Sequence, residues 1–205
     1  MNRHISSEYV GIGHPDKVAD QISDAILDLY LSKDPSARVA AETLVSGNKL
    51  IVAGEITSTV MFPPEFINGT ITNAVINAGY NSNVPCQFRD GNLDISIYIK
   101  PQSLNIHESV DKSDGDIGAG DQGIMFGYAC DQTPELMPMP IVYAHKLVKK
   151  LADIRKKQPK LMPYLRPDAK SQVTIEYSEN GKPLRVDAVV ISTQHDGDAK
   201  QNKIK

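Results

Sequence analysis

Hydrophobic side chains repeat with a helical period near the start of the chain and with a period of two soon afterwards. Apolar positions recur every three or four residues over 16–33, which predicts an amphipathic helix between Pro15 and Asp34. Two apolar runs, 38–45 and 50–58, flank a turn that contains Gly and Asn, and this arrangement predicts a β-hairpin.

A second helix and another strand follow the hairpin. Pro63 and Pro64 open a helical pattern that Gly79 closes. Residues 93–100 then alternate between apolar and polar side chains, as in a strand with one buried face. With a short strand near residues 5–10, the expected order is strand, helix, strand, strand, helix, strand.

The same order begins again after a polar stretch that contains several glycines. A strand is expected at 124–130, a helix at about 140–157, and two further strands at 172–177 and 184–192, joined at an Asn-Gly turn. This second series stops one helix and one strand short of the first.

These patterns predict an α+β fold made of repeated βαββαβ units, of which the first is complete and the second is not. The expected division is a first unit at 1–104, a Gly-bearing loop at 105–123, an incomplete βαββ unit at 124–195 and a polar tail at 196–205. The polar ending is more typical of a chain end than of a cut through a helix.

Composition indicates an ordinary globular protein. Of the 205 residues, 40% are hydrophobic and 23% are charged, and no apolar stretch suits a membrane span or a signal peptide. We therefore expect a cytoplasmic protein, without membrane contact, in which Cys86 and Cys130 are reduced. A formal net charge of −3 gives no general attraction to nucleic acid, so none is expected as a partner.

Several polar segments are candidates for chemistry, and the first lies at the mouth of the first helix, where His14, Asp16 and Lys17 stand. Free N–H groups and the helix dipole attract phosphate at such a position, and a metal ion on Asp16 would bind phosphate oxygens as well. An Asp that serves only the helix dipole, with His14 exposed to solvent, explains the same residues equally well.

Two further segments combine glycines or charges. Three glycines between 118 and 123 surround Asp121 and allow the backbone to approach a ligand closely, although simple turn chemistry explains them too. Asp168 and Lys170 lie two residues apart at the entrance to a strand and therefore share one face. Surface ion pairing is the alternative there.

Glu42 and Glu55 each lie within an apolar run, near the centre of the two hairpin strands. A carboxylate in such a run is costly unless a cation pairs with it, which favours a binding role. A solubilising role on an edge strand is the alternative.

Taken together, these segments resemble the methionine adenosyltransferase, or S-adenosylmethionine synthetase, family over about the whole chain. The resemblance rests on Ser7-Glu8, Gly13 to Lys17, Ala19 to Asp24, Gly118 to Ala129, Leu136 to Pro138, Tyr143 to His145, Leu165 to Val173 and Ser192 to His195. Family members are nearly twice as long, so the chain corresponds to their N-terminal half.

The resemblance implies a subunit of an enzyme that forms S-adenosylmethionine from ATP and L-methionine. In the family, each subunit contains three βαββαβ units, and the active sites lie between two subunits of a dimer. The methionine sulfur displaces the triphosphate from C5′ of ATP, and the triphosphate is then cleaved to phosphate and pyrophosphate, with Mg²⁺ and K⁺ as cofactors. Such a displacement depends on aligned reactants and a neutralised leaving group.

Carried over position by position, the resemblance implies a role for each candidate. The catalytic residues would be His14, which stabilises the leaving triphosphate, and Lys170, which reaches phosphate and substrate. Asp16 would bind Mg²⁺ and Glu42 would bind K⁺. The contacts with methionine, adenosine or the nucleotide would come from Glu55, Gln102, Asp121, Asp168 and Lys17.

Two departures from the family pattern bear on function. Gly11-Ile12 stands where the family usually has Ser-Glu, so any contact made there is lost. The absent half carries the family's basic segments that grip the triphosphate. We therefore expect a hetero-oligomer with a second polypeptide that resembles the family's C-terminal half. A non-catalytic regulatory or scaffolding chain, and a fragment of a longer enzyme, are the alternatives.

Overall fold

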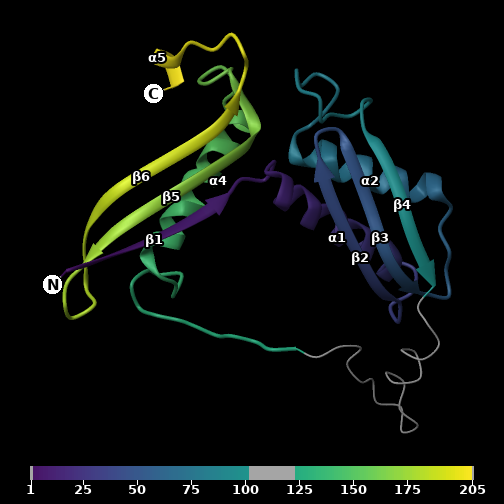
Figure 1. The fold of residues 1–205 in the computed structure, drawn as a ribbon, viewed down its shortest axis with the longest axis horizontal. Helices are drawn as coiled ribbons and strands as arrows, with labels where there is room; N and C mark the ends of the chain where they lie inside the picture. Colours follow the sequence, from purple (N-terminus) through teal and green to yellow (C-terminus); the bar gives the residue numbers. More distant parts are fainter. Residues whose placement is uncertain (1, 102–122, 205) are drawn as a thin grey trace, which may run out of the picture.

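Two three-stranded sheets account for the paired strands in the described part of the chain, and helices cover one face of each (Figure 1). The structure is a computed structural model that describes residues 2–101 and 123–204. Its elements are β1 (Arg3–Val10), α1 (Pro15–Leu31), β2 (Arg38–Ser46), β3 (Lys49–Thr57), α2 (Pro64–Ala78), β4 (Asp94–Pro101), α4 (Met139–Lys157), β5 (Leu165–Tyr177), β6 (Pro183–His195) and α5 (Gln201–Ile204). The predicted α+β class is confirmed.

The sheet β2-β3-β4 follows the predicted pattern closely. β2 and β3 form the expected antiparallel hairpin, and its turn places Gly47 at φ +60°, in the left-handed region that favours glycine. β4 lies parallel to β3 because the chain crosses over through α2 before it returns to the sheet. α1 and α2 cover the same face of this sheet (Figure 1).

The core under this sheet comes from the predicted helical faces. In α1, Val18, Ile22, Ile26 and Tyr30 are all buried, one on each successive turn. Full burial of one such aliphatic side chain contributes about 1.5–3 kcal/mol to folding. Gly79 ends α2 in the left-handed conformation, as the sequence predicts.

The first strand does not pair with the other strands of its predicted unit. β1 runs antiparallel to β5, from Arg3 opposite Tyr177 to Val10 opposite Lys170, and this sheet has the order β1-β5-β6. The expectation of a complete first unit is therefore wrong for β1. An alternating pattern identifies a strand and its buried face, but it does not identify the neighbouring strand. The chain then crosses to α1, under the other sheet (Figure 1).

The predicted strand at 124–130 is not a strand. Its backbone forms no ladder with any described residue, and its apolar side chains are exposed, Phe126 to 95%. An apolar run becomes a strand only where it pairs with a neighbouring strand, and this run pairs with none of the described strands. The second unit thus consists of α4, β5 and β6, and its boundaries along the chain stay a prediction.

β5 and β6 extend further than predicted, to residues 165 and 195. Alternate side chains of β5 are buried, and several of them pack against α4. β6 is an edge strand whose apolar side chains are at least 44% exposed at Leu184, Val186, Val189, Val190 and Ile191. A long apolar edge of this kind is a template for pairing with another chain.

The predicted polar tail is partly helical and contacts the start of β5. Tyr164 accepts a backbone hydrogen bond of 3.0 Å from Asp196, and its hydroxyl donates to the backbone oxygen of Lys203 in α5 at 2.7 Å. Across the described ranges, no helix combines the length and the apolarity that a bilayer span requires.

Candidate active site

His14 caps the N-terminus of α1, at the helix mouth that the sequence predicts. Its backbone is extended, with φ −65° and ψ 140°, and its Nδ1 accepts a hydrogen bond of 3.2 Å from the backbone N–H of Asp16. In the neutral ring the proton is therefore on Nε2. This arrangement satisfies one free N–H of the helix and keeps Nε2 available as a donor.

Asp16 extends into solvent beside His14. Its side chain is 87% exposed, and its Oδ2 lies 3.8 Å from Nδ1 of His14. Magnesium in proteins is commonly held by one or two carboxylates together with substrate phosphates, so an accessible carboxylate at a helix N-terminus fits that ion. Among the described residues, Asp16 is not part of a group of three potential metal ligands. Phosphate or another chain would have to complete the coordination.

Asp168, near the start of β5, lies close to this pair. Partial burial raises the pKa of Asp168 above its usual value; His14 acts to lower it, and Asp16 acts to raise it. Gly13 contacts Pro167, and Asp168 lines the same cavity as Gly13 and Pro15, so the beginning of β5 and the N-terminus of α1 face each other. A cation between the two carboxylates would favour the ionised form of Asp168.

A cavity of about 310 Å³ opens beside Asp168. Gly13 and Pro15 line it at the N-terminus of α1, Tyr80 lines it just after the end of α2, and Gln194 lines it from β6. Its volume is at the lower end of the range for small-molecule sites. The cavity therefore lies where parts of both sheets' layers meet.

Lys170 shares one face of β5 with Asp168, as the spacing of two residues predicts. Its Nζ lies 2.9 Å from Oε1 of Glu8 on β1, and both side chains are about half exposed. Such a pair contributes little to stability. Glu8 was not among the predicted site residues, because its approach to Lys170 depends on the pairing of β1 with β5, which the pattern does not show.

Lys17 lines a different cavity from Asp168. Its Nζ lies 4.9 Å from the centroid of the Tyr9 ring and 3.4 Å from the Tyr9 hydroxyl. This second cavity, of about 440 Å³, is also lined by His145, whose pKa is lowered by burial and by the charge of Lys17. Successive helical residues point about 100° apart, so Asp16 and Lys17 leave α1 in different directions.

Glu42 and Glu55 lie on the exposed face of the β2-β3 hairpin. Glu42 stands opposite Ala53 and Glu55 opposite Ala40, so the two carboxylates are diagonal neighbours on one face. Both carboxylates are exposed, so the cost of an unpaired charge in an apolar run does not arise at either position, and their binding roles stay a prediction. β2 is also an edge strand, which keeps the solubilising role of Glu42 open.

Glu42 supplies one exposed carboxylate, and a potassium site there would need further oxygen ligands from elsewhere. Gln102 and Asp121, the other two predicted methionine contacts, lie outside the described residues, as does most of the Gly-bearing loop around Asp121.

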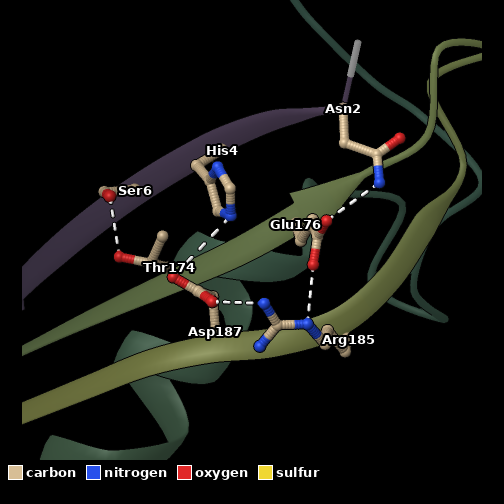
Figure 2. A network of polar contacts seen from close by, with 7 residues as sticks. All are labelled: Asn2, His4, Ser6, Thr174, Glu176, Arg185 and Asp187. Atoms are coloured by element: carbon tan, nitrogen blue, oxygen red, sulfur yellow. Dashed lines mark hydrogen bonds and ion pairs between the residues drawn. The ribbon is translucent and has the colours of Figure 1, made fainter.

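A separate polar network joins β1, β5 and β6 (Figure 2). His4, Glu176 and Asp187 bring three potential metal-ligand atoms within 4.8 Å of one another. Arg185 binds both carboxylates, with its Nε 2.6 Å from Glu176 and its Nη2 2.7 Å from Asp187. Because the guanidinium supplies the positive charge that a metal ion would bring, we interpret this network as a structural clasp between the strands.

A capped helix N-terminus, two carboxylates and an adjacent cavity define a candidate site for a phosphate-bearing ligand and a divalent cation. The family model described as S-adenosylmethionine synthetase, N-terminal domain, matches residues 2–104, and the model of the central domain matches residues 116–205. The chain belongs to the S-adenosylmethionine synthetase family.

Known relatives match along nearly the whole chain. The S-adenosylmethionine synthase of Myxococcus xanthus (strain DK1622) is 50% identical over 202 residues, which are 98% of this chain and 48% of the relative. The enzyme of the same name from Parvibaculum lavamentivorans is 48% identical over 201 residues, 98% of this chain and 50% of the relative. That of Salinibacter ruber is 50% identical over 201 residues, with the same two shares. The chain spans about half the length of these relatives.

Proposed function

We propose that this chain is a subunit of a cytoplasmic methionine adenosyltransferase, which forms S-adenosylmethionine from ATP and L-methionine and cleaves the triphosphate to phosphate and pyrophosphate. The observation that carries the proposal is the meeting of His14, Asp16 and Asp168 at one helix N-terminus, in a chain of this family. This is the position at which phosphate and a cation are favoured.

In the proposed reaction, the methionine sulfur forms a bond to C5′ of ATP, and the bond from C5′ to the triphosphate oxygen breaks. That oxygen leaves with the electron pair, while the thioether sulfur has no proton to lose and needs no general base. His14 would stabilise the developing charge, because its Nδ1 is engaged by the helix and its Nε2–H remains a donor. The N-terminus of α1 adds to the same effect.

Cations complete the proposed charge balance. Asp16 would hold Mg²⁺, which when bound neutralises phosphate oxygens, and Glu42 would contribute to a K⁺ site. Lys170 would reach phosphate and substrate from β5, on the same face as Asp168, which would contact adenosine. The other proposed contacts are those of Lys17 with the nucleotide, and of Glu55, Gln102 and Asp121 with methionine.

A second polypeptide is part of the proposal. ATP carries about four negative charges, and a site that includes Asp16 and Asp168 needs more cations than Lys170 and Lys17 supply. The apolar edge of β6, which pairs with no other strand in the described part of the chain, offers a place for another chain. A partner resembling the remaining half of the relatives would answer both needs in a hetero-oligomer.

A non-catalytic regulatory or scaffolding subunit is the second candidate. It is favoured by Ile12, which stands where the family usually has Glu and which lines the cavity of Lys17 and His145 rather than that of Asp168. An aliphatic side chain there cannot bind a cation or an amino group.

Synthesis of S-adenosylmethionine by the chain, with and without a polypeptide matching the remaining half of the relatives, tests these proposals. The assay contains ATP, L-methionine, Mg²⁺ and K⁺, and intact mass verifies each preparation. We expect negligible synthesis by the chain alone and turnover by the complex, which His14→Ala removes. Robust turnover by the verified single chain would overturn the need for a partner. A stable complex without any turnover would overturn the catalytic proposal in favour of the regulatory one.

A further inference from the structure

The segment 11–14, which carries His14, is fixed by hydrogen bonds to its surroundings. The backbone N–H of Gly11 donates to the backbone oxygen of Ala169 at 2.6 Å, and the N–H of His14 donates to Gly11 at 3.0 Å. The side-chain amide of Gln21 donates to the backbone oxygen of Ile12 at 2.9 Å. These contacts tie the segment to β5, which carries Ala169, and to α1, which carries Gln21.

A further contact comes from a distant part of the chain. The hydroxyl of Tyr80 donates to the backbone oxygen of Gly13 at 2.6 Å. Tyr80 follows the end of α2, is only 4% exposed, and packs edge-on against Phe88 with ring centroids 5.0 Å apart. Burial is the main factor that raises the pKa of Tyr80, so its hydroxyl keeps its proton and stays a donor.

Pro167 packs directly against Gly13 as well. A Cβ added at Gly13 would lie 2.4 Å from Cβ of Pro167, so the backbone of this segment rests directly on the start of β5. The Gly13 peptide is therefore held both by a hydroxyl from the layer of α2 and by a ring from β5. Neither contact involves His14 itself.

We propose that Tyr80 is a positioning residue for His14. The Gly13 oxygen belongs to the planar peptide unit that also contains the nitrogen and the Cα of His14, so fixing that oxygen fixes the position from which the His14 side chain starts. The bond from the Asp16 N–H to Nδ1 then holds the ring itself. The inference rests on the proposed function, because it concerns the action of His14 on a leaving group. Displacement of a catalytic group by about 1 Å costs on the order of 100-fold in rate.

Tyr80→Phe removes only the hydroxyl, and Tyr30→Phe is its matched control. Tyr30 is also buried and packs edge-on against Phe62, with ring centroids 5.0 Å apart, at the far end of α1 from His14. Burial raises the pKa of Tyr30 and the backbone of Phe62 acts to lower it, so this hydroxyl too faces a backbone group. A merely structural role predicts that the two variants lose similar stability and leave the His14 ring unchanged. A positioning role predicts that Tyr80→Phe alone alters it.

The first measurement is the NMR spectrum of the histidine rings in the isolated chain, with the His14 signals assigned by their loss in His14→Ala. We expect Tyr80→Phe to shift and broaden these signals and Tyr30→Phe to leave them in place. Equal spectra for the two Phe variants would overturn the inference. If Tyr80→Phe does not fold, 4-aminophenylalanine at position 80, which keeps a donor on the same ring, should fold with parental His14 signals; displaced signals in that folded variant would also overturn it.

The second measurement is turnover in the assembled enzyme. Tyr80→Phe should lower kcat about 10- to 100-fold with little change in KM for ATP, and 4-aminophenylalanine should restore much of the loss. If His14→Ala leaves turnover unchanged, the proposed function fails, whatever Tyr80 does. If His14→Ala removes turnover while the Phe variants at 80 and 30 behave alike, only the positioning role fails.

Discussion

Replacing Gly13 by Ala should destabilise the protein, although such a change normally stabilises a chain by about 0.4–1 kcal/mol by restricting its unfolded state. An added Cβ would lie 2.4 Å from Cβ, 2.5 Å from the carbonyl carbon and 2.6 Å from the oxygen of Pro167. These contacts are closer than Cβ atoms reach in real structures, and two of the three atoms are backbone. The segment that carries His14, or the start of β5, therefore has to move.

Close contacts of this kind cost about 1–3 kcal/mol. In a chain of this size, each 1 kcal/mol lowers Tm by about 2–4 °C, so the expected decrease for Gly13→Ala is about 2–12 °C. Gly69→Ala is the matched control. Gly69 lies inside α2, and an added Cβ there has no atom within 4 Å. Because Ala has a higher helix propensity than Gly, Gly69→Ala should increase the free energy of unfolding by up to about 1 kcal/mol and raise Tm accordingly.

Thermal unfolding followed by far-UV circular dichroism compares the three proteins, and urea unfolding at one temperature gives the free energies. A Gly13→Ala protein that melts at or above the parental temperature, while Gly69→Ala behaves as expected, would contradict this prediction. The backbone of Gly13 would then not rest on Pro167, and the packing of the site against β5 would be incorrect.

Three other substitutions test separate parts of the account. In the assembled enzyme, His14→Ala should lower S-adenosylmethionine formation about 100- to 1000-fold and weaken ATP binding far less, because its contribution arises in the transition state; a parental rate would contradict this. Lys170→Met should abolish activity and hardly change Tm, since its ion pair is exposed, and a collapsed Tm would leave the catalytic role without support. Hydrogen bonds from Ser36 and then from the backbone of Thr59 hold the pKa of Asp34 well below its usual range. The stability that this adds is present above about pH 4 and is lost as the pH falls. When the free energy of unfolding is measured with urea at a series of pH values, Asp34→Asn should therefore weaken its decrease at acid pH. An unchanged decrease would argue against the hydrogen bonds.

Local patterns predicted the helices and the hairpin because those elements are built from contacts between near neighbours in sequence. The buried series Val18, Ile22, Ile26 and Tyr30 repeats at the helical period, and Gly79 ends α2 where a left-handed residue is required. The partner of β1 was beyond such patterns, since strand pairing is decided between distant segments. The same limit explains why the apolar run 124–130 was taken for a strand.

The candidate site was predictable to the same extent. Pro15 and Asp16 identify a helix N-terminus from sequence alone, and a spacing of two places Asp168 and Lys170 on one face. The helical period also directs the side chains of Asp16 and Lys17 away from each other, although the two residues are adjacent in one sequence segment. Contacts such as Tyr80 with Gly13 were out of reach, because they join segments that only the packed structure brings together.

The pairing of β1 with β5 makes the site depend on the register of a sheet. Val10 stands opposite Lys170, and the next residue, Gly11, donates its N–H to the backbone oxygen of Ala169. The segment that carries His14 therefore starts beside the first residues of β5. β1 is largely exposed and so gains little from burial. The polar network of Figure 2 holds the N-terminal end of β1 on β5 and β6, at the end of the strand away from His14. A slip of one residue would turn Glu8 to the opposite face and carry His14 about 3.4 Å along β5, away from Asp168.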